Sequence, residues 1–146
     1  MQINRILVAV DDSSFTVKTV ATAYDLAGKL QSGLGIINVI DPAIVAIGAD
    51  TVVYPMEQMG DVKKQAEELM QRIIGQLGDA TMVQQFISEG KPSDEIVAAA
   101  NQWGADLIVI GTHGRTGLMH MIMGSVAESV IRHSNIPVLV VPSKAG

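Results

Sequence analysis

Residues 6–14 have the sequence ILVAVDDSS, and this stretch indicates which class of fold the chain adopts. Ile6–Val10 is a continuous apolar run without polar alternation, which is typical of a strand buried on both faces of a parallel sheet. Asp11, Asp12 and Ser13 follow with side chains that suit a turn and the start of a helix. The stretch therefore predicts a buried strand that passes through a short turn into a helix.

Apolar residues then return at helical spacing, and another apolar run follows each helical segment. The first helical face would carry Val17, Val20, Ala21, Tyr24 and Ala27, and the last would carry Val126, Ala127, Val130 and Ile131. Four further strands are predicted at Ile36–Ile40, Val83–Ser88, Leu107–Ile110 and Val138–Val141. The third strand is the most polar of these runs, so we expect it near an edge of the sheet.

Strands and helices alternate along the whole chain. This alternation predicts an α/β protein with a single doubly wound, five-stranded parallel sheet and helices on both faces. The chain has 146 residues, and a domain typically has roughly 100–200, so we expect residues 1–146 to form a single domain. In such sheets ligands bind at the carboxyl ends of the strands, where the winding direction reverses.

Composition excludes several classes of protein. The 10 Lys and Arg residues against 15 Asp and Glu residues give a net charge of −5, so neither nucleic acid nor an anionic membrane is an expected partner. The apolar share of 48% excludes disorder, and the absence of cysteine excludes disulfides and thiolate metal sites. No apolar run approaches the ~18 residues of a membrane helix, and the N-terminus lacks a signal-peptide pattern, so we predict a cytoplasmic protein.

Residues 41–56 show no regular period and form a predicted loop, with Asp41-Pro42 and Tyr54-Pro55 as turn signals. Loops of this length in compact domains are usually lids or binding loops, or else mobile segments. Apolar residues such as Ile44 and Val53 argue against full solvation of the segment. We expect the loop to pack on its own domain or on a partner subunit.

The fourth strand has the most unusual end, because glycines punctuate its connection to the last helix. Gly111 and Gly114 free the backbone to approach a ligand closely, and Gly124-Ser125 begins a helix whose N-terminal N–H groups favour an anion. Arg115 would add positive charge. These residues suit a polyphosphate. The same glycines also suit ordinary turns and helix caps, and residue types alone leave both interpretations open.

The spacing of these residues, Gly111-x2-Gly114-x9-Gly124-Ser125, resembles the nucleotide-binding pattern of the universal stress protein family. Four spaced positions inside matching flanks make the resemblance specific, and it runs along the whole chain. The other matching segments are Ile6–Ser13, Val39–Asp41, Gly90-x-Pro92, Gly124–Glu128 and Pro137–Pro142. The resemblance implies a five-stranded sheet of order 3-2-1-4-5 and, for members with this glycine pattern, binding of ATP.

Similarity to this family also implies roles for individual residues. Asp11 would face the ribose or a metal-bridged phosphate, the main chain of Val39 would bind the adenine edge, and Ala9 would line the pocket. The phosphates would be held by Gly111, Gly114, Gly124, Ser125 and Val126, with His113 and Arg115 beside them.

A metal ion is the second ligand to consider. Mg²⁺ typically binds one or two carboxylates together with phosphate oxygens, so Asp11, Asp12 and the Ser125 hydroxyl are candidate ligands for an ion that accompanies ATP. Asp12 departs from the family, in which many members have glycine or another small residue at this position. Whether Asp12 binds a metal or is a solvated turn residue stays open.

The chain lacks the motifs of well-known hydrolytic sites. No P-loop is present, and His113, His120 and His133 do not have metal-ligand spacing. Residues 88–90, at the end of the third strand, contain no Asp, which argues against a phosphate-receiver domain. No general base stands out. We therefore expect a nucleotide-sensing regulatory module rather than an enzyme, with a slow ATPase or an autophosphorylating enzyme as the alternative.

The fifth strand lies at an edge of the sheet in this order. Its residues are all apolar: Val138, Leu139, Val140 and Val141. An exposed apolar edge invites pairing with another chain, and the family resemblance implies a homodimer formed through this strand.

Overall fold

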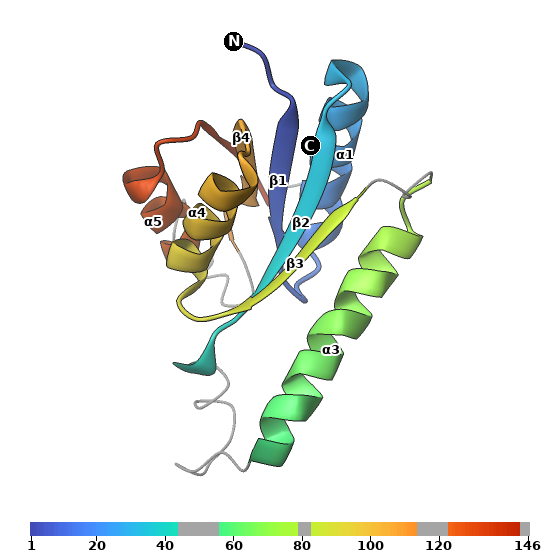
Figure 1. Cartoon of the computed structure of the whole chain (residues 1–146), viewed down its shortest axis with the longest axis vertical. Coiled ribbons are helices and arrows are strands. Elements are labelled where there is room, and N and C mark those ends of the chain that lie inside the picture. Colours follow the sequence, from blue (N-terminus) through green and yellow to red (C-terminus); the bar gives the residue numbers. More distant parts are fainter. Residues whose placement is uncertain (44–55, 79–82, 114–122, 144–146) are drawn as a thin grey trace.

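The computed structural model describes residues 1–43, 56–78, 83–113 and 123–143, in which strands and helices alternate (Figure 1). The strands are β1 (Arg5–Val10), β2 (Gly33–Ile40), β3 (Gln84–Glu89), β4 (Leu107–Gly111) and β5 (Val138–Val141). The helices are α1 (Thr16–Leu30), α3 (Met56–Gly75), α4 (Pro92–Trp103) and α5 (Ser125–His133). Within these ranges no helix combines the length and apolar character needed to cross a membrane.

The strands are parallel and lie in the order β3-β2-β1-β4-β5, which confirms both the predicted α/β class and the strand order that the resemblance implied. Helices α1 and α3 cover one face of the sheet, and α4 and α5 cover the other (Figure 1). β3 and β5 are the two edges, as expected. The winding direction reverses between β1 and β4, so the switch point lies beyond their carboxyl ends.

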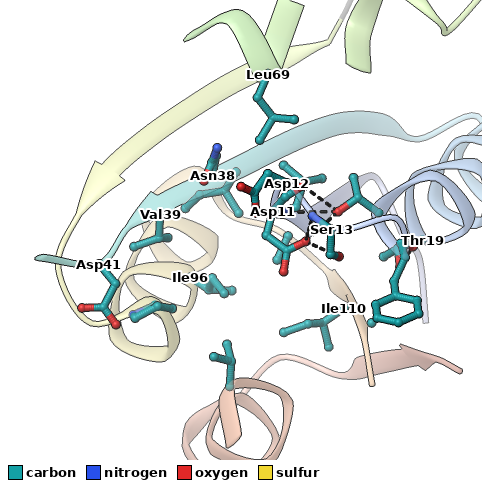
Figure 2. A pocket seen from close by; sticks show the side chains of 18 of the residues that line it. Asp11, Asp12, Ser13, Thr19, Asn38, Val39, Asp41, Leu69, Ile96 and Ile110 are labelled. Carbon is teal, nitrogen blue, oxygen red and sulfur yellow. Dashed lines mark hydrogen bonds between the residues drawn. The ribbon is translucent and has the colours of Figure 1, made fainter. Parts of the chain in front are cut away.

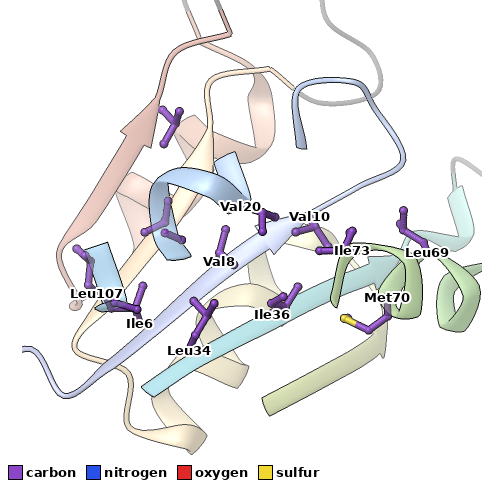
Figure 3. Close-up of a cluster of buried hydrophobic side chains, with 14 residues drawn as sticks. Ile6, Val8, Val10, Val20, Leu34, Ile36, Leu69, Met70, Ile73 and Leu107 are labelled. Carbon is purple, nitrogen blue, oxygen red and sulfur yellow. The ribbon is translucent and has the colours of Figure 1, made fainter. Parts of the chain in front are cut away.

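Strand β1 shows why the opening run is apolar throughout. Ile6 and Val8 belong to the core between the sheet and the α1–α3 layer (Figure 3), whereas Leu7 belongs to the core beneath α4 and α5. All three side chains are fully buried, because alternate residues of a strand point to opposite faces and each face is covered by helices. Each such burial contributes about 1.5–3 kcal/mol to folding.

The buried face of α1 is displaced from the predicted face. The prediction was wrong for Val17, which is 65% exposed, and for Ala21, which is exposed as well. Thr16 and Thr19 are buried in their place. Each threonine hydroxyl lies within hydrogen-bond distance of a nearby main-chain carbonyl, at 2.8 and 3.1 Å. This local pairing lets two polar side chains enter the core where periodicity alone placed apolar ones.

Strand β2 begins at Gly33, earlier than the predicted Ile36, so Gly33 and Gly35 extend the strand rather than break it. Glycine is required at position 35 because the indole ring of Trp103 lies against the backbone there, and a Cβ atom would be 2.9 Å from the ring. A glycine inside a strand often marks such an approach of a neighbouring group.

Smaller corrections concern the later elements. Ile131 was predicted on the buried face of α5 but is 42% exposed, because this short helix buries only Ala127 and Val130. Strand β3 begins and ends one position later than the predicted Val83–Ser88. Of the predicted loop 41–56, residues 44–55 lie outside the described part of the chain.

Candidate functional site

A cavity of about 270 Å³ opens at the carboxyl ends of the central strands. Its walls come from the ends of β1, β2 and β4, from the starts of α1, α4 and α5, and from one side of α3. Eight of the predicted site residues line it, namely Ala9, Asp11, Val39, Gly111, His113, Gly124, Ser125 and Val126. The other two, Gly114 and Arg115, lie outside the described residues. Folding thus brings together residues that are far apart in the sequence.

The turn after β1 is organised by the carboxylate of Asp11 (Figure 2). Its Oδ1 accepts a hydrogen bond from the Ser13 N–H at 2.9 Å and lies 3.0 Å from the Thr16 hydroxyl oxygen. The Asp11 N–H donates to the same hydroxyl at 3.1 Å. A carboxylate that caps its own turn in this way ties the end of β1 to the start of α1 and holds both at the cavity wall.

The other side of the switch point is formed by the end of β4 and the start of α5. The Gly124 N–H donates to the carbonyl oxygen of Thr112 at 2.5 Å, and a Cβ atom on Gly124 would lie 2.9 Å from that oxygen. Gly124 has φ −72°, so the close approach and not the backbone conformation requires glycine here. This contact places the N-terminus of α5, with Ser125 and Val126, against the cavity, where its N–H groups favour an anion.

His113 links this region to the edge strand β5. Its Nδ1 lies 3.1 Å from the Ser143 hydroxyl, and the Ser143 N–H donates to the Thr112 hydroxyl at 3.1 Å. Thr112 and His113, which follow β4, are therefore hydrogen-bonded to Ser143, which follows β5. The imidazole is held at the wall of the cavity, within the predicted phosphate region.

Adjacent residues of β2 face opposite sides of the cavity (Figure 2). Val39 lies on the side of Ile96 and α4, whereas Asn38 lies on the side of Leu69 and α3. The pairing of β2 with β1 ends at Val10 opposite Asn38. The carbonyl of Val39 therefore lies one step beyond the end of β1, at the cavity.

The charged side chains of the cavity are mostly acidic. The described lining residues include the carboxylates of Asp11, Asp12 and Asp41, against the guanidinium of Arg72. In the described part of the chain, no three His, Asp or Glu side chains are grouped closely enough to hold a metal ion. Because the lining is mostly acidic, a polyphosphate in this cavity would need a cation beside it. Because few protein ligands are grouped there among the described residues, that cation would be coordinated partly by oxygens of the polyphosphate.

Sequence reasoning missed two parts of the cavity. Val62, Gln65, Leu69 and Arg72 of α3 line it, and no motif in the sequence marks them, because they reach the cavity through the packing of the helix on the sheet. Asn38 also lines it. This residue did carry a signal, because it is the single polar side chain within the apolar run Ile36–Ile40.

Fold and site together define a doubly wound α/β protein with a cavity at its switch point. A sequence model described as the universal stress protein family matches residues 2–142. Universal stress protein YxiE of Bacillus subtilis is 32% identical over 145 residues, which cover 94% of this chain and 98% of that protein. The chain belongs to the universal stress protein family.

Solved structures agree with this assignment. The structure of protein MJ0577 of Methanocaldococcus jannaschii matches with a TM-score of 0.85 at 29% identity, and each chain is covered completely. A universal stress protein crystallised in complex with cAMP has the same fold, with a TM-score of 0.64 at 23% identity over 99% of this chain and 100% of that one.

Proposed function

We propose that the protein binds ATP in the switch-point cavity and acts as a nucleotide-sensing regulatory module of the cytoplasm, with residues 1–146 forming one domain. The observation that carries this proposal is the convergence of eight predicted nucleotide-binding residues on one cavity. The cavity volume of about 270 Å³ is near the lower end of the roughly 300–1,000 Å³ that is usual for small-molecule sites.

The chemistry of the walls suggests how ATP would lie. The triphosphate belongs at the start of α5, because Gly124, Ser125 and Val126 present a helix N-terminus to the cavity. The adenosine then extends across the end of β1 towards β2, where the Val39 carbonyl can accept a hydrogen bond from the adenine amino group. Asp11 stands between these two ends, near the expected position of the ribose and the first phosphate.

Mg²⁺ fits this arrangement as a companion of ATP. The acidic side chains Asp11 and Asp12 line the same cavity as the proposed phosphate site, so a bare triphosphate would be repelled there. The ion would neutralise part of that charge and would take carboxylate oxygens from this turn, together with the Ser125 hydroxyl. ATP affinity should therefore depend on Mg²⁺.

Identification of bound nucleotide tests the proposal most directly. Purified protein is denatured, and the released small molecules are identified by chromatography and mass spectrometry. Nucleotide-free protein is then titrated with ATP and with cAMP, with and without Mg²⁺, by calorimetry and thermal shift. We expect ATP to bind and to raise Tm. Absence of released nucleotide, together with an unchanged Tm in every titration, would reject nucleotide binding.

A pair of glycine substitutions tests where the phosphates bind. Gly124→Ala places a Cβ atom 2.9 Å from the Thr112 carbonyl oxygen, so the start of α5 must move away from β4. We expect ATP affinity to fall at least about tenfold while the circular dichroism spectrum is retained. Gly28→Ala is the matched control, because no heavy atom lies within 4 Å of its Cβ position on α1. Equal affinities of the two variants would contradict the phosphate assignment.

A regulatory module and a slow ATPase differ in turnover. A binding module hydrolyses at most one ATP per chain, whereas an ATPase turns over repeatedly and loses this activity in Asp11→Ala or His113→Ala. His113 lines the same cavity as the proposed phosphate site, but a base must also be aligned with an attacking water for catalysis. We therefore favour the binding module.

Strand β5 supports a homodimer as the working form. It is an edge strand, and Leu139, halfway along it, is 37% exposed. Pairing with another copy would satisfy this edge and cover its apolar side chains. Light scattering at several concentrations should give a mass twice that of the chain. A monomer at all concentrations would reject the dimer without affecting nucleotide binding.

A further inference from the structure

The side chain of Asn38 is buried, and the described residues offer it no hydrogen-bond partner. It is 8% exposed, and no group in the described part of the chain forms a hydrogen bond with its amide. The side chain lies at the wall of the cavity on the side of Leu69 (Figure 2). The buried residues of β1 and α3 that line the cavity, Val10, Ala66 and Leu69, are all apolar.

Such an amide lowers the stability of the folded protein. An amide in an apolar environment loses its hydrogen bonds to water, and the loss is not offset when no protein group replaces them. An aliphatic side chain of similar volume would be more stable at this position, as Ile36 is on the same face of β2. The amide is therefore better explained by a ligand that bonds to it than by packing.

The position of Asn38 indicates which part of a nucleotide it would meet. The proposed phosphate site lies at β4 and α5, and the sheet order places β1 and then β2 progressively further from it. Asn38 is on β2, at the end of the cavity remote from the phosphates. We propose that the Asn38 side chain binds the adenine base and is a specificity-determining residue of the site; this inference rests on the proposed ATP binding.

The chemistry of the two groups is complementary. A side-chain amide carries one acceptor and one donor side by side, and the N6 amino group and N7 of adenine present the matching donor and acceptor. The second N6 hydrogen, on the other edge of the base, remains for the Val39 carbonyl. Because Asn38 and Val39 are adjacent on β2, one base can contact the side chain of one and the main chain of the other.

A nucleotide analogue tests this contact in the unmodified protein. In 7-deaza-ATP a C–H group replaces N7, so the base can no longer accept a hydrogen bond from the Asn38 amide. We expect nucleotide-free protein to bind 7-deaza-ATP at least about fivefold more weakly than ATP in calorimetric titrations with Mg²⁺. Equal affinities for the two nucleotides would overturn the proposal.

Asn38→Leu tests the same contact from the protein side. It replaces the amide with an apolar group of the same branching, and the adjoining cavity gives room for its larger volume. We expect ATP affinity to fall about tenfold and the difference between ATP and 7-deaza-ATP to disappear. The nucleotide-free variant should melt about 3–8 °C higher than the unmodified protein, because an unpaired buried amide is gone. Asn101→Leu, the same change at an exposed position of α4, is the control and should not raise Tm or alter affinity.

The outcomes separate this inference from the proposal on which it rests. If the unmodified protein binds ATP and Asn38→Leu binds it equally well, the base contact is wrong and the nucleotide site stands. If the unmodified protein binds no adenine nucleotide, ATP binding and the base contact are both rejected. A lower Tm for Asn38→Leu, together with equal affinities of the unmodified protein for ATP and 7-deaza-ATP, would show that the amide serves packing, and it would overturn the inference.

Discussion

The two ends of the parallel sheet differ in what their polar groups contact. At the amino end, the Asp106 carboxylate accepts hydrogen bonds from the N–H groups of Asn4 and Arg5 at 2.8 and 3.0 Å, and the Ser32 hydroxyl donates to the Ile3 carbonyl. At the carboxyl end, polar groups line a cavity. Polar groups at both ends form hydrogen bonds within the chain, but those of Asp11 and His113 at the carboxyl end also line the switch-point cavity.

This difference separates stability from recognition. Substitutions at the amino end remove contacts that hold the fold together and lie far from the cavity, so they should lower stability without changing ligand affinity. Substitutions at the carboxyl end should lower ligand affinity without lowering stability, because residues at a binding site are selected for binding rather than for stability. The following variants test whether stability and ligand affinity depend on different ends of the sheet.

Trp103→Ala should have the largest effect at the amino end. The indole packs on Gly35, stacks edge-on with Phe86 at 5.7 Å between ring centroids, and lies beneath the Arg5 guanidinium at 5.6 Å. Loss of this half-buried ring should lower the free energy of unfolding by about 3 kcal/mol. Urea denaturation measures this, and ATP affinity should stay within about twofold. A large loss of affinity at unchanged stability would contradict the division between the two ends.

Asp106→Ala should have the next largest effect. It leaves the Asn4 and Arg5 N–H groups without their carboxylate partner. Because these are two charge-assisted bonds at a solvent-accessible position, we expect the free energy of unfolding to fall by about 2 kcal/mol. Asp106→Asn keeps an acceptor oxygen and should recover part of the loss. Calorimetric titration with ATP should give the same affinity for both variants as for the unmodified protein.

Much of the fold could be predicted from the sequence, because β1 and β4 are apolar runs and Asn38 is the single polar residue within Ile36–Ile40 of β2. The failures have physical causes. Thr16 and Thr19 pair with nearby carbonyls and so are buried, which displaces Val17 to the surface; hydrophobic periodicity does not include such pairing. Gly35 extends β2 because a ring from α4 packs against it, and this contact joins residues that are distant in sequence.

The part of the candidate site formed by the strand ends and by the start of α5 could be predicted from the sequence, whereas the part formed by α3 could not. A Cβ atom on Gly124 would meet the Thr112 carbonyl oxygen and one on Gly111 would meet the Thr19 hydroxyl, so the region of the proposed phosphates has glycines that are visible in the sequence. The α3 side has no such signal, because Leu69 and Arg72 reach the cavity through tertiary packing alone. Asn38 lies between these cases: its polarity within an apolar strand is visible in the sequence, but only the structure shows that its amide is buried at the cavity wall.

Asp11→Asn should have the smallest effect and is the sharpest test at the carboxyl end. Asparagine keeps an oxygen that can accept the bond from the Ser13 N–H, so the free energy of unfolding should change by less than about 1 kcal/mol. The lost charge removes a ligand for Mg²⁺, so ATP affinity with Mg²⁺ should fall about fivefold, or about 1 kcal/mol. In EDTA the same change removes a charge that repels the phosphates, and affinity should not fall. A similar loss of affinity in both conditions would show that Asp11 acts through the turn and not through a metal-bridged phosphate.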